Sequence, residues 1–526
     1  MKNYNRLMFQ LLAIVGILLV GCALGKKETK APKDTPPNII YVLADDLGYG
    51  DIGAYNPEGK IKTPNIDKMA EEGIRFTDAH TSSSVCTPTR YGIMTGRYNW
   101  RSELKQGVLT GRSPGLIPSS RTTVASLLKK QGYYTAFIGK WHLGWDWAEK
   151  VKKDTIVEIG WDTRSFDNVD FSKPIKNSPN DLGFDYAYGH CGSLDMAPYV
   201  YVENGKVTAQ PTTITENKRK YTKWRKGPTA PDFEHEQVTP NFFKRGMKYI
   251  KQQAQNDKPF FLYLPLPSPH TPILPLEEWQ GKSGLNPYGD FMMMIDHYMG
   301  ALIQTIKDAG IEENTLIVFT SDNGCSPAAD INEMIEKGHY PNSIFRGHKA
   351  DIFEGGHRVP FIVKWPARIK AGAVSDEIIS LNDLMGTVAA ITGYQLKDNE
   401  GEDSYNILPV LTGETLEAPL REATVHHSIK GSFAIRKGNW KLSMCAGSGG
   451  WSYPNKKEIL DTLPKMQLYN LKADPQEASN LVAEHLDKVE ELKGLLTKYI
   501  REGRSTPGIP QQNDGDESWE QLWWMN

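Results

Sequence analysis

Four short polar motifs in this sequence each follow an apolar run of the kind that forms a buried strand. In chain order they are Asp45-Asp46, Gly139-Lys140-Trp141-His142-Leu143-Gly144, Pro269-His270-Thr271-Pro272 and Ser321-Asp322-Asn323-Gly324. In an open α/β sheet, ligands bind beyond the carboxyl ends of the strands. We therefore expect the four motifs to meet at one edge of a sheet.

The acidic motifs contain the ligand types of a hard divalent cation. Their oxygen-bearing side chains are those of Asp45, Asp46, Asp322 and Asn323. Three carboxylates and one amide suit Ca²⁺ or Mg²⁺ better than a thiolate-seeking metal. Taken singly, each motif is more typical of a helix cap or a turn. Together they favour a shared cation, because clustered carboxylates without one raise each other's pKa.

A second group of residues can handle an anion. Cys86 begins the run Cys86-Thr87-Pro88-Thr89-Arg90, and its spacing from Arg90 puts both side chains on one face if a helix begins there. Helix N-termini bind anions well. A bare pattern of this length is more often a buried cysteine beside a turn proline, so the assignment depends on the other motifs.

Further basic side chains accompany this group. Arg90, Lys140 and Lys349 can neutralise the oxygens of a bound oxyanion. His142 and His270 are candidates for proton transfer, because imidazole titrates near neutral pH. We predict that these side chains gather at the same sheet edge as the acidic motifs.

Short apolar runs alternate with helical patterns from about residue 38 to residue 400. This alternation predicts an α/β fold with a mixed, mostly parallel sheet sandwiched by helices. Strands are predicted at 38–43, 134–138, 260–264 and 315–319. Helices are predicted at 66–72, at 123–130 and over about twenty residues from Phe291.

After Leu411 the pattern changes. Short antiparallel strands are predicted at 433–436, 440–442 and 467–470, followed by a charged helix from Ala473 to about Glu502. The predicted domains are a large catalytic domain at 38–415, a smaller α+β subdomain at 416–510 and a tail at 511–526. The tail either docks back on the surface or remains loose.

The N-terminus has the pattern of an export signal. Lys2 and Arg6 precede an apolar stretch, residues 7–20, that is short for a membrane span. The ending Leu19-Val20-Gly21-Cys22 resembles the lipobox of bacterial lipoproteins, in which the cysteine is acylated and becomes the new N-terminus.

Residues 1–22 are therefore predicted to be a lipoprotein signal with Cys22 as the lipidation site, and residues 23–37 a flexible tether. The protein is expected to be exported and held to a bacterial membrane through its lipid, in the periplasm or at the cell surface. An uncleaved anchor helix and an ordinary secretory signal are the alternatives.

The composition limits the possible partners. The chain of 526 residues has 61 Lys+Arg and 63 Asp+Glu, a formal net charge of −2, so no global field predicts nucleic acid binding. Any recognition of anions must be local. Besides Cys22 and Cys86 the chain has Cys191, Cys325 and Cys445. These three cannot all pair within one chain, and the sequence does not select a disulfide.

Most of the chain resembles the type I sulfatases. The motifs that carry the resemblance stand in the family's order: Asn38-Ile39-Ile40 through Asp45-Asp46-Leu47-Gly48, the C-x-P-x-R segment from Cys86 to Arg90, Gly139-Lys140-Trp141-His142, Pro269-His270, Ser321-Asp322-Asn323-Gly324, and Arg346-Gly347-His348-Lys349 through Glu354-Gly355-Gly356-His357-Arg358-Val359-Pro360. Thr89, where many members have serine, is a mild departure. The resemblance implies an alkaline-phosphatase-like fold, and Gln467-Leu468-Tyr469-Asn470-Leu471 with Asp474-Pro475 resembles the family's second subdomain.

The resemblance also implies a mechanism. In that family the cysteine is oxidised after translation to formylglycine, so Cys86 would be modified by a formylglycine-generating or sulfatase-maturating enzyme. A sulfate monoester would be hydrolysed through a covalent sulfo-enzyme intermediate on this residue. One hydroxyl of the formylglycine hydrate would attack sulfur, and collapse of the other to the aldehyde would expel sulfate.

Roles for the remaining motif residues follow from the same resemblance. A calcium ion, with Mg²⁺ as the alternative, would be bound by the modified Cys86 together with Asp45, Asp46, Asp322 and Asn323. Arg90 and Lys140 would orient and stabilise the hydrate. Lys349 and His270 would contact the sulfate and the leaving oxygen. His142 would assist the collapse of the hydrate.

Substrate recognition has weaker signals in the sequence. The segment from Gly189 to Met196 resembles a loop that in relatives brings a serine and an acidic residue to the sulfated group, which makes Ser193, Asp195 and His190 candidates. An ordinary structured loop is the alternative. Export and the resemblance together predict a sulfated carbohydrate, a host or algal glycan, as substrate.

Two other functions are compatible with the sequence. One is a phosphonate or phosphate monoester hydrolase, because related proteins use the same nucleophile and a similar metal. The other is a catalytically silent binder of sulfated glycans. The second is disfavoured, because every nucleophile and metal-ligand position is filled.

Overall fold

The computed structural model describes residues 35–151 and 166–525. One compact unit runs from Pro36 to Asn526. The predicted signal at 1–22, Cys22 and most of the tether lie outside the described residues, so these assignments stay predictions. In the described ranges, no helix has both the length and the apolar character needed to cross a membrane.

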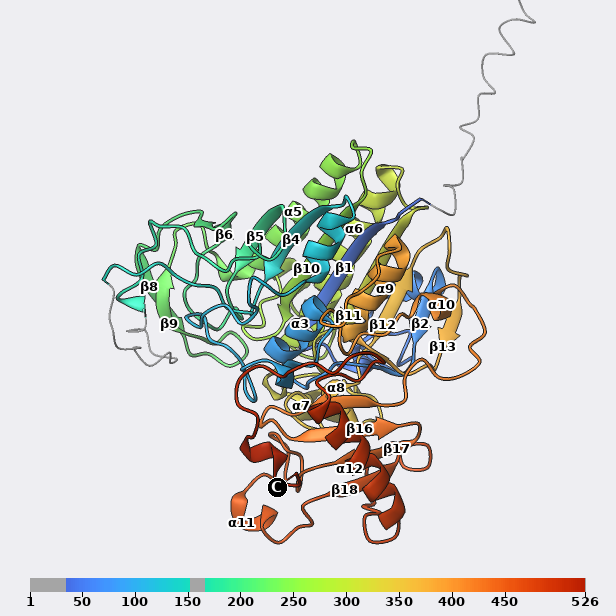
Figure 1. The fold of residues 1–526 in the computed structure, drawn as a ribbon. Coiled ribbons are helices and arrows are strands. Elements are labelled where there is room, and N and C mark those ends of the chain that lie inside the picture. Colours follow the sequence, from blue (N-terminus) through green and yellow to red (C-terminus); the bar gives the residue numbers. More distant parts are fainter. Residues whose placement is uncertain (1–34, 152–165, 526) are drawn as a thin grey trace, which may run out of the picture. The chain divides into compact units, whose positions relative to one another are not determined.

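A ten-stranded sheet forms the centre of the compact unit (Figure 1). In spatial order its strands are β13 (Ala373–Ser375), β2 (Ile74–Phe76), β12 (Phe361–Lys364), β11 (Thr315–Ser321), β1 (Asn38–Asp45), β10 (Phe260–Pro269), β4 (Tyr134–Lys140), β5 (Tyr186–His190), β6 (Val202–Glu203) and β7 (Lys206–Val207). From β11 to β5 the neighbours are parallel, whereas β12 is antiparallel to β11. The sheet is therefore mixed and mostly parallel, which confirms the predicted fold class.

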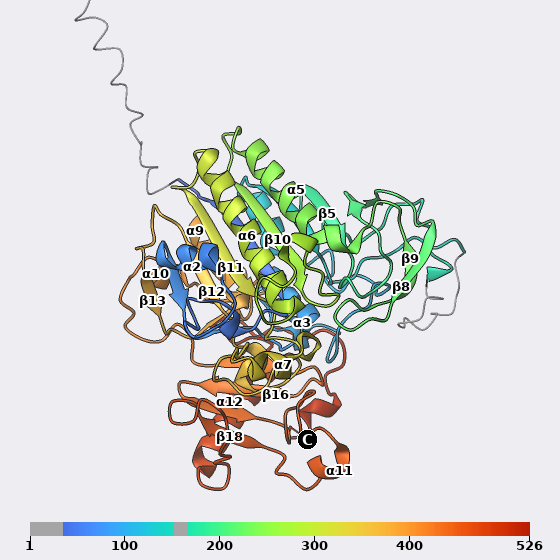
Figure 2. The same ribbon diagram turned by 180° about the vertical axis from the view of Figure 1, so that it is seen from behind.

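Helices cover both faces of this sheet. On one face α2 (Pro64–Glu71) and α5 (Val238–Gln253) pack against α6 (Pro287–Asp308), as Figure 2 shows. On the other face α3 (Cys86–Thr95), α4 (Val124–Lys130) and α9 (Leu384–Thr392) pack together. Because both faces are covered, central strands are continuous apolar runs. Every residue from Ile39 to Ala44 is at most 1% exposed.

The strands predicted in the large domain are all present, and β1, β4, β10 and β11 continue past the predicted ends. The helices predicted at 66–72 and 123–130 are also confirmed, as α2 and α4. The start predicted for α6 at Phe291 is wrong, because the helix begins at Pro287. Asn286 caps it by accepting hydrogen bonds from the amides of Tyr288 and Gly289.

A separate four-stranded antiparallel sheet follows. Its strands, in order, are β15 (Thr424–His427), β16 (Phe433–Lys437), β17 (Trp440–Ser443) and β18 (Gln467–Asn470). The helix α12 (Leu486–Arg501) packs on β16 and β17. Three of the four strands were predicted, and β15 was missed. The predicted boundaries at 415/416 and 510/511 stay predictions.

The charged helix predicted from Ala473 is too long at its start. Residues 473–485 form turns instead. Asp474 accepts a hydrogen bond from the amide of Ser479, and Asn480 accepts one from the amide of Val482. Side chains that bond nearby amides in this way compete with helix formation.

The remaining short elements connect these layers. They are the pairs β3 (Ala79–His80) with β14 (Ile379–Ser380) and β8 (Thr213–Asn217) with β9 (Trp224–Thr229), and the helices α7 (Ile331–Glu336), α8 (Glu354–His357), α10 (Leu408–Leu411) and α11 (Lys457–Leu460). Cys86, Cys191, Cys325 and Cys445 are free thiols, so these four described cysteines form no disulfide with one another.

The C-terminal tail docks on the rest of the unit, which decides between the two predicted alternatives. Arg97 donates a hydrogen bond of 2.7 Å to Asp514. The indole of Trp524 donates to the hydroxyl of Thr497 in α12, and Leu522 is 2% exposed. The tail therefore covers apolar surface of the small sheet and its helix.

A buried network of charges joins the small sheet to the large one. Arg436 of β16 donates to both oxygens of Asp78 at 2.7 Å. Lys441 of β17 lies 3.0 Å from Glu354 of α8 and 2.8 Å from Glu477. Lys441, Glu354 and Glu477 are fully buried. Buried charges of this kind must keep their partners.

We therefore expect Lys441→Met to destabilise the fold strongly. It would leave two buried carboxylates without their shared cation, at a cost of about 3–5 kcal/mol. The measurement is chemical denaturation followed by tryptophan fluorescence. Lys437→Met is the matched control, because Lys437 lies on the neighbouring strand and pairs at the surface with Glu422, where loss costs about 1 kcal/mol or less. Equal unfolding midpoints for the two variants would contradict the expectation.

Candidate active site

The four polar motifs lie at one edge of the large sheet. Asp45, Lys140 and Pro269 are the last residues of β1, β4 and β10, and Asp322 directly follows β11. These four strands are adjacent and parallel in the order β11, β1, β10, β4, so their carboxyl ends point the same way. The arrangement expected from the sequence is therefore found.

Three carboxylates and an amide converge at this edge. The amide of Asp46 donates to Asp322 at 3.2 Å, and the side chain of Asn323 donates to Asp46 at 2.7 Å. Asp46 has a φ of 67°, a left-handed conformation that is uncommon outside glycine. This turn interrupts the alternation of side chains along a strand, so that Asp46 can join Asp45 at one site.

The donor set fits a hard divalent cation. One carboxylate oxygen of Asp45 and the amide oxygen of Asn323 are buried and accept no hydrogen bond from the described part of the chain. Candidate ligand atoms of Asp45, Cys86 and Asp322 all lie within 4.8 Å of one another. Buried oxygens that lack donors are what a calcium or magnesium ion would coordinate.

Three buried cations contact the same carboxylates. Arg90 donates to Asp322 through Nε and Nη2, at 3.0 and 2.8 Å. Lys349 lies 2.7 Å from one oxygen of Asp46. Lys140 is hydrogen-bonded to Asp45. Each acidic side chain of the cluster therefore has its own cationic partner.

The pKa values of Asp45 and Asp322 are shifted in opposite directions. Burial acts to raise the pKa of Asp45, but Lys140, His270 and Arg90 outweigh it and hold that pKa well below its usual range. For Asp322, burial and the charge of Asp45 raise the pKa in spite of Arg90. A divalent cation would relieve this repulsion, because it favours the ionised form of both groups.

Cys86 lies beside this cluster, as the first residue of α3. It is 2% exposed, and burial raises the pKa of its thiol to about 11 despite Lys140 and Lys349. Arg90, one turn later in α3, reaches the cluster from the same helix, as the spacing predicted. The thiol of an unmodified Cys86 is thus protonated at neutral pH and is a weak nucleophile.

The two histidines have one well-defined hydrogen bond each. The Nε2 of His142 lies 2.9 Å from the carbonyl oxygen of Leu109, and its Nδ1 is buried with no partner among the described residues. Burial, followed by the charge of Lys140, lowers the pKa of His142. His142 is therefore neutral, and its free Nδ1 can accept a hydrogen bond.

His270 lies on the acidic side of the site. Its Nε2 is 3.6 Å from Asp46, and its Nδ1 is 2.5 Å from the carbonyl oxygen of Thr271. Burial and the charge of Lys349 lower the pKa of His270. His270 and Lys349 thus both contact Asp46, from two different loops.

The predicted substrate contacts follow β5, the strand next to β4. His190 ends β5, and Ser193 and Asp195 lie in the loop after it. Within the described ranges, His190 Nε2, Ser193 Oγ and one oxygen of Asp195 are buried without a hydrogen-bond partner. The other oxygen of Asp195 is paired with Arg225. The substrate roles of these residues stay predictions.

Two features were missed in the sequence. One is Arg225, which the run of Lys and Arg between residues 218 and 226 could have indicated. The other is a group of buried imidazoles: His80 and His357 approach to 3.0 Å, and the ring of His426 stacks on His357 with centroids 3.8 Å apart. The three histidines lie in separate sequence segments, so no local spacing connects them.

Comparison with known proteins agrees with this geometry. A family model described as Sulfatase matches residues 37–394. An N-acetylgalactosamine-6-O-sulfatase of Bacteroides thetaiotaomicron is 32% identical, over 94% of this chain and 99% of its own length. Arylsulfatase A of Homo sapiens is 31% identical, over 85% of this chain and 83% of its own length.

Solved structures resemble the chain as well. A Bacteroides thetaiotaomicron structure from work on the metabolism of multiple glycosaminoglycans has a TM-score of 0.76 and 31% identity, covering 88% of this chain and 98% of that one. The structure of Ps i-CgsB in complex with k-i-k-neocarrahexaose has a TM-score of 0.66 and 25% identity, covering 91% and 95%.

We expect calcium to stabilise the metal-free protein through the acidic cluster. A cation bound only by the native state at about 100 times its dissociation constant adds about 2.7 kcal/mol. Asp45→Asn removes a ligand and should abolish this gain, whereas Asp257→Asn, at an exposed position, should retain it. The measurement is the melting temperature with and without added Ca²⁺. An equal rise in both variants would rule out a calcium site at Asp45.

Proposed function

The chain belongs to the sulfatase family of sulfuric ester hydrolases, and we propose that it removes sulfate from a sulfated carbohydrate by means of a formylglycine formed at Cys86. The observation that carries the proposal is the charge-balanced cluster around Cys86, in which each carboxylate has a cationic partner. The fold, a mostly parallel sheet between helices with a small antiparallel sheet, is that of its structural relatives in the alkaline-phosphatase superfamily.

The position of Cys86 supports the need for modification. A thiol whose pKa is raised to about 11 by burial is a poor nucleophile at neutral pH. If Cys86 were converted to formylglycine, its hydrate would supply one hydroxyl to accept the sulfuryl group and a second whose loss of a proton would release sulfate. The conversion requires a maturation enzyme as a partner.

The oxygen-rich side of the site would hold the metal. Asp45, Asp46, Asp322 and Asn323 are the proposed ligands of a calcium ion, with Mg²⁺ as the alternative, together with modified residue 86. A bound calcium ion would polarise the S–O bonds of a sulfate ester. The buried oxygens of Asp45 and Asn323 that lack donors support this assignment.

The other side chains then divide the work of charge and proton transfer. Arg90, Lys140 and Lys349 neutralise oxygens of the sulfate, where the exclusion of water strengthens each interaction. His142 accepts the proton of the hydrate at its free Nδ1. His270 and Lys349 both contact Asp46, and we assign them to the leaving oxygen and the sulfate.

The carbohydrate part of the proposal is supported by the relatives. N-acetylgalactosamine-6-O-sulfatase and arylsulfatase A are similar over most of the chain. Ps i-CgsB was solved with an oligosaccharide. Ser193, Asp195 and His190 are the proposed contacts to the sulfated sugar.

Two alternatives differ in a measurable way. A phosphonate or phosphate monoester hydrolase would use the same cluster, and a silent glycan binder would use it without turnover. Purified protein should hydrolyse an aryl sulfate faster than the matching aryl phosphonate and aryl phosphate esters. Faster turnover of either phosphorus ester would overturn the choice of sulfate, and binding without turnover would favour the silent binder.

We expect Cys86→Ala to lower sulfate release by about 1,000-fold or more, because groups that act on one nucleophile lose their effect together. Cys445→Ala is the control. Cys445 is a free thiol that follows β17 of the small sheet, so this variant should keep its activity. Peptide mass spectrometry of the wild type should find the aldehyde at residue 86. An active wild type with an unmodified thiol there would refute the mechanism.

We also propose that the protein is an exported lipoprotein anchored through Cys22, on the strength of the lipobox-like ending of residues 7–22. Cells grown with an alkyne fatty acid should label the wild type, because the acyl chains attached at Cys22 would carry the alkyne. Cys22→Ala should lose the label, and Cys445→Ala should keep it. Equal labelling of Cys22→Ala would exclude this anchor.

A further inference from the structure

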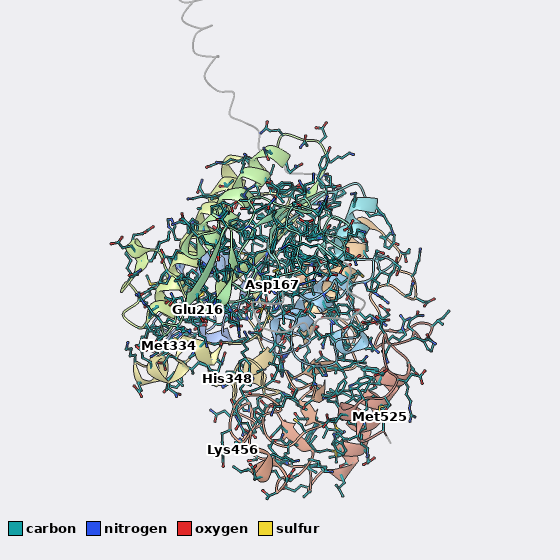
Figure 3. The ribbon with its side chains drawn as sticks, turned by 90° about the vertical axis from the view of Figure 1, so that its left-hand side faces the viewer. Asp167, Glu216, Met334, His348, Lys456 and Met525 are labelled. Atoms are coloured by element: carbon teal, nitrogen blue, oxygen red, sulfur yellow. The ribbon has the colours of Figure 1, made fainter. Side chains whose placement is uncertain are left out.

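The hairpin of β8 and β9 carries basic side chains next to the active site. It lies at the edge of the unit beyond β5 in Figure 1, and Figure 3 turns this side toward the viewer and labels Glu216 of β8. The hairpin and its neighbours line a cavity of about 590 Å³. Its charged lining consists of the cations Lys218, Arg219, Lys220, Lys223 and Arg225 and the carboxylates Asp195 and Asp330.

Direct hydrogen bonds fasten this hairpin to the catalytic edge. The carbonyl oxygen of Tyr221 accepts a hydrogen bond of 3.1 Å from the hydroxyl of Thr271 and one of 2.8 Å from the amide of Ile273. Thr271 follows His270 and also lines the cavity. The cavity therefore begins where the proposed leaving-group side of the site ends.

The backbone of the hairpin is strained at its point of attachment. Tyr221 has a φ of 66°, a left-handed conformation that is a genuine outlier for a bulky residue. Strain of this kind is concentrated at functional sites. At Tyr221 it accompanies the two hydrogen bonds to the segment that carries His270.

Some of the basic side chains are already neutralised. Arg225 is paired with Asp195, and Lys220 lies 2.6 Å from Asp330. Lys218 is 3.3 Å from Glu216, but the Lys218 side chain is 78% exposed, and exposed pairs are weak. The charges of Arg225 and Lys220 are thus balanced by carboxylates, and the excess positive charge of the lining must come from the remaining cations.

Arg219 and Lys223 supply that excess. Both are exposed, and neither forms an ion pair with any residue of 35–151 or 166–525. They stand out in a chain whose formal net charge is −2, so the positive charge is local to this cavity. Two unpaired cations in a concave site are suited to binding an anion from solution.

We propose that this cavity binds a second anionic group of the same saccharide, a sulfate or a carboxylate, while the first sulfate is at the catalytic cluster. This inference rests on the proposed function and narrows the substrate to a sugar or oligosaccharide with at least two anionic groups. Arg219 and Lys223 are the specificity-determining residues. A cavity of about 590 Å³ has the size of a small-molecule site and can admit a sugar ring.

Aromatic residues of the same wall support a saccharide as the occupant. Trp224 and Tyr221 both line the cavity. The indole of Trp224 is fixed by a hydrogen bond to Thr215 and by stacking on His235, with ring centroids 4.0 Å apart. Rigid aromatic side chains with a polar atom supply contact area at low entropic cost, which suits the face of a sugar ring.

The test compares substrates that differ only in their second anion. N-acetylgalactosamine 6-sulfate carries one anion. A disaccharide of hexuronic acid and N-acetylgalactosamine 6-sulfate adds a carboxylate, and N-acetylgalactosamine 4,6-disulfate adds a sulfate. The wild type should have a higher kcat/KM on at least one of the doubly anionic substrates. Their two ratios distinguish a carboxylate from a sulfate as the second group.

The variant is Arg219→Gln with Lys223→Gln. It should raise KM for the preferred doubly anionic substrate by about tenfold or more, since two charge-assisted hydrogen bonds are lost. Its kcat/KM on the singly anionic sugar should be unchanged. The control, Lys206→Gln with Lys251→Gln, removes the same charge at two exposed positions and should behave like the wild type. Salt at about 0.5 M should reduce the wild-type preference as well.

Binding keeps this test independent of turnover. In the Cys86→Ala background, titration calorimetry with the same doubly anionic sugars should show the loss of affinity for the Arg219/Lys223 variant and not for the control. If no sulfate ester is hydrolysed, the proposed function fails, yet this titration still decides the inference. Equal affinities of the two variants, or equal losses on singly and doubly anionic sugars, would overturn it.

Discussion

The candidate active site places three carboxylates and three cations in contact at the end of a buried sheet, where water cannot screen them. Asp45, Asp46 and Asp322 are all at most 1% exposed, and each contacts Lys140, Lys349 or Arg90. In a low-dielectric interior neither set of charges is stable without the other. With all six groups ionised, their charges sum to zero. A divalent cation would make the site net positive, which would favour the binding of an anionic ester beside Cys86.

The same burial bears on the modification that we propose for Cys86. A thiol under a layer of protein, with its pKa raised to about 11, stays protonated. The nearby lysines lower that pKa without overcoming burial. A formylglycine hydrate at residue 86 would attack through a hydroxyl oxygen and would not require a thiolate. The buried, charged surroundings that keep the thiol protonated would therefore be compatible with catalysis by the modified residue. Burial of the site thus disfavours attack by a thiolate and is compatible with attack by a hydroxyl.

The strands and the polar motifs could be predicted from sequence because both depend on local patterns. Apolar runs such as 38–43 are buried on both faces, and the residues after them reach one edge by topology alone. Contacts that depend on distant segments could not be predicted. The pairing of Asp195 with Arg225 requires the hairpin β8–β9 to fold back on the loop after β5. The start of α12 was misplaced because the side chains of Asp474 and Asn480 bond amides in the turns before it.

The central position of β1 affects when residue 86 becomes buried during synthesis of the chain. β1 pairs with β10 and β11, which are translated long after it. The segment before Cys86 is covered later still, when the amide of Ser84 donates to the carbonyl oxygen of His427. Until those segments are synthesised, they cannot cover residue 86. In the folded unit Cys86 is 2% exposed. If Cys86 is modified as we propose, the modifying enzyme would need to reach it in the nascent or unfolded polypeptide, and a molecule that folded first would keep its thiol.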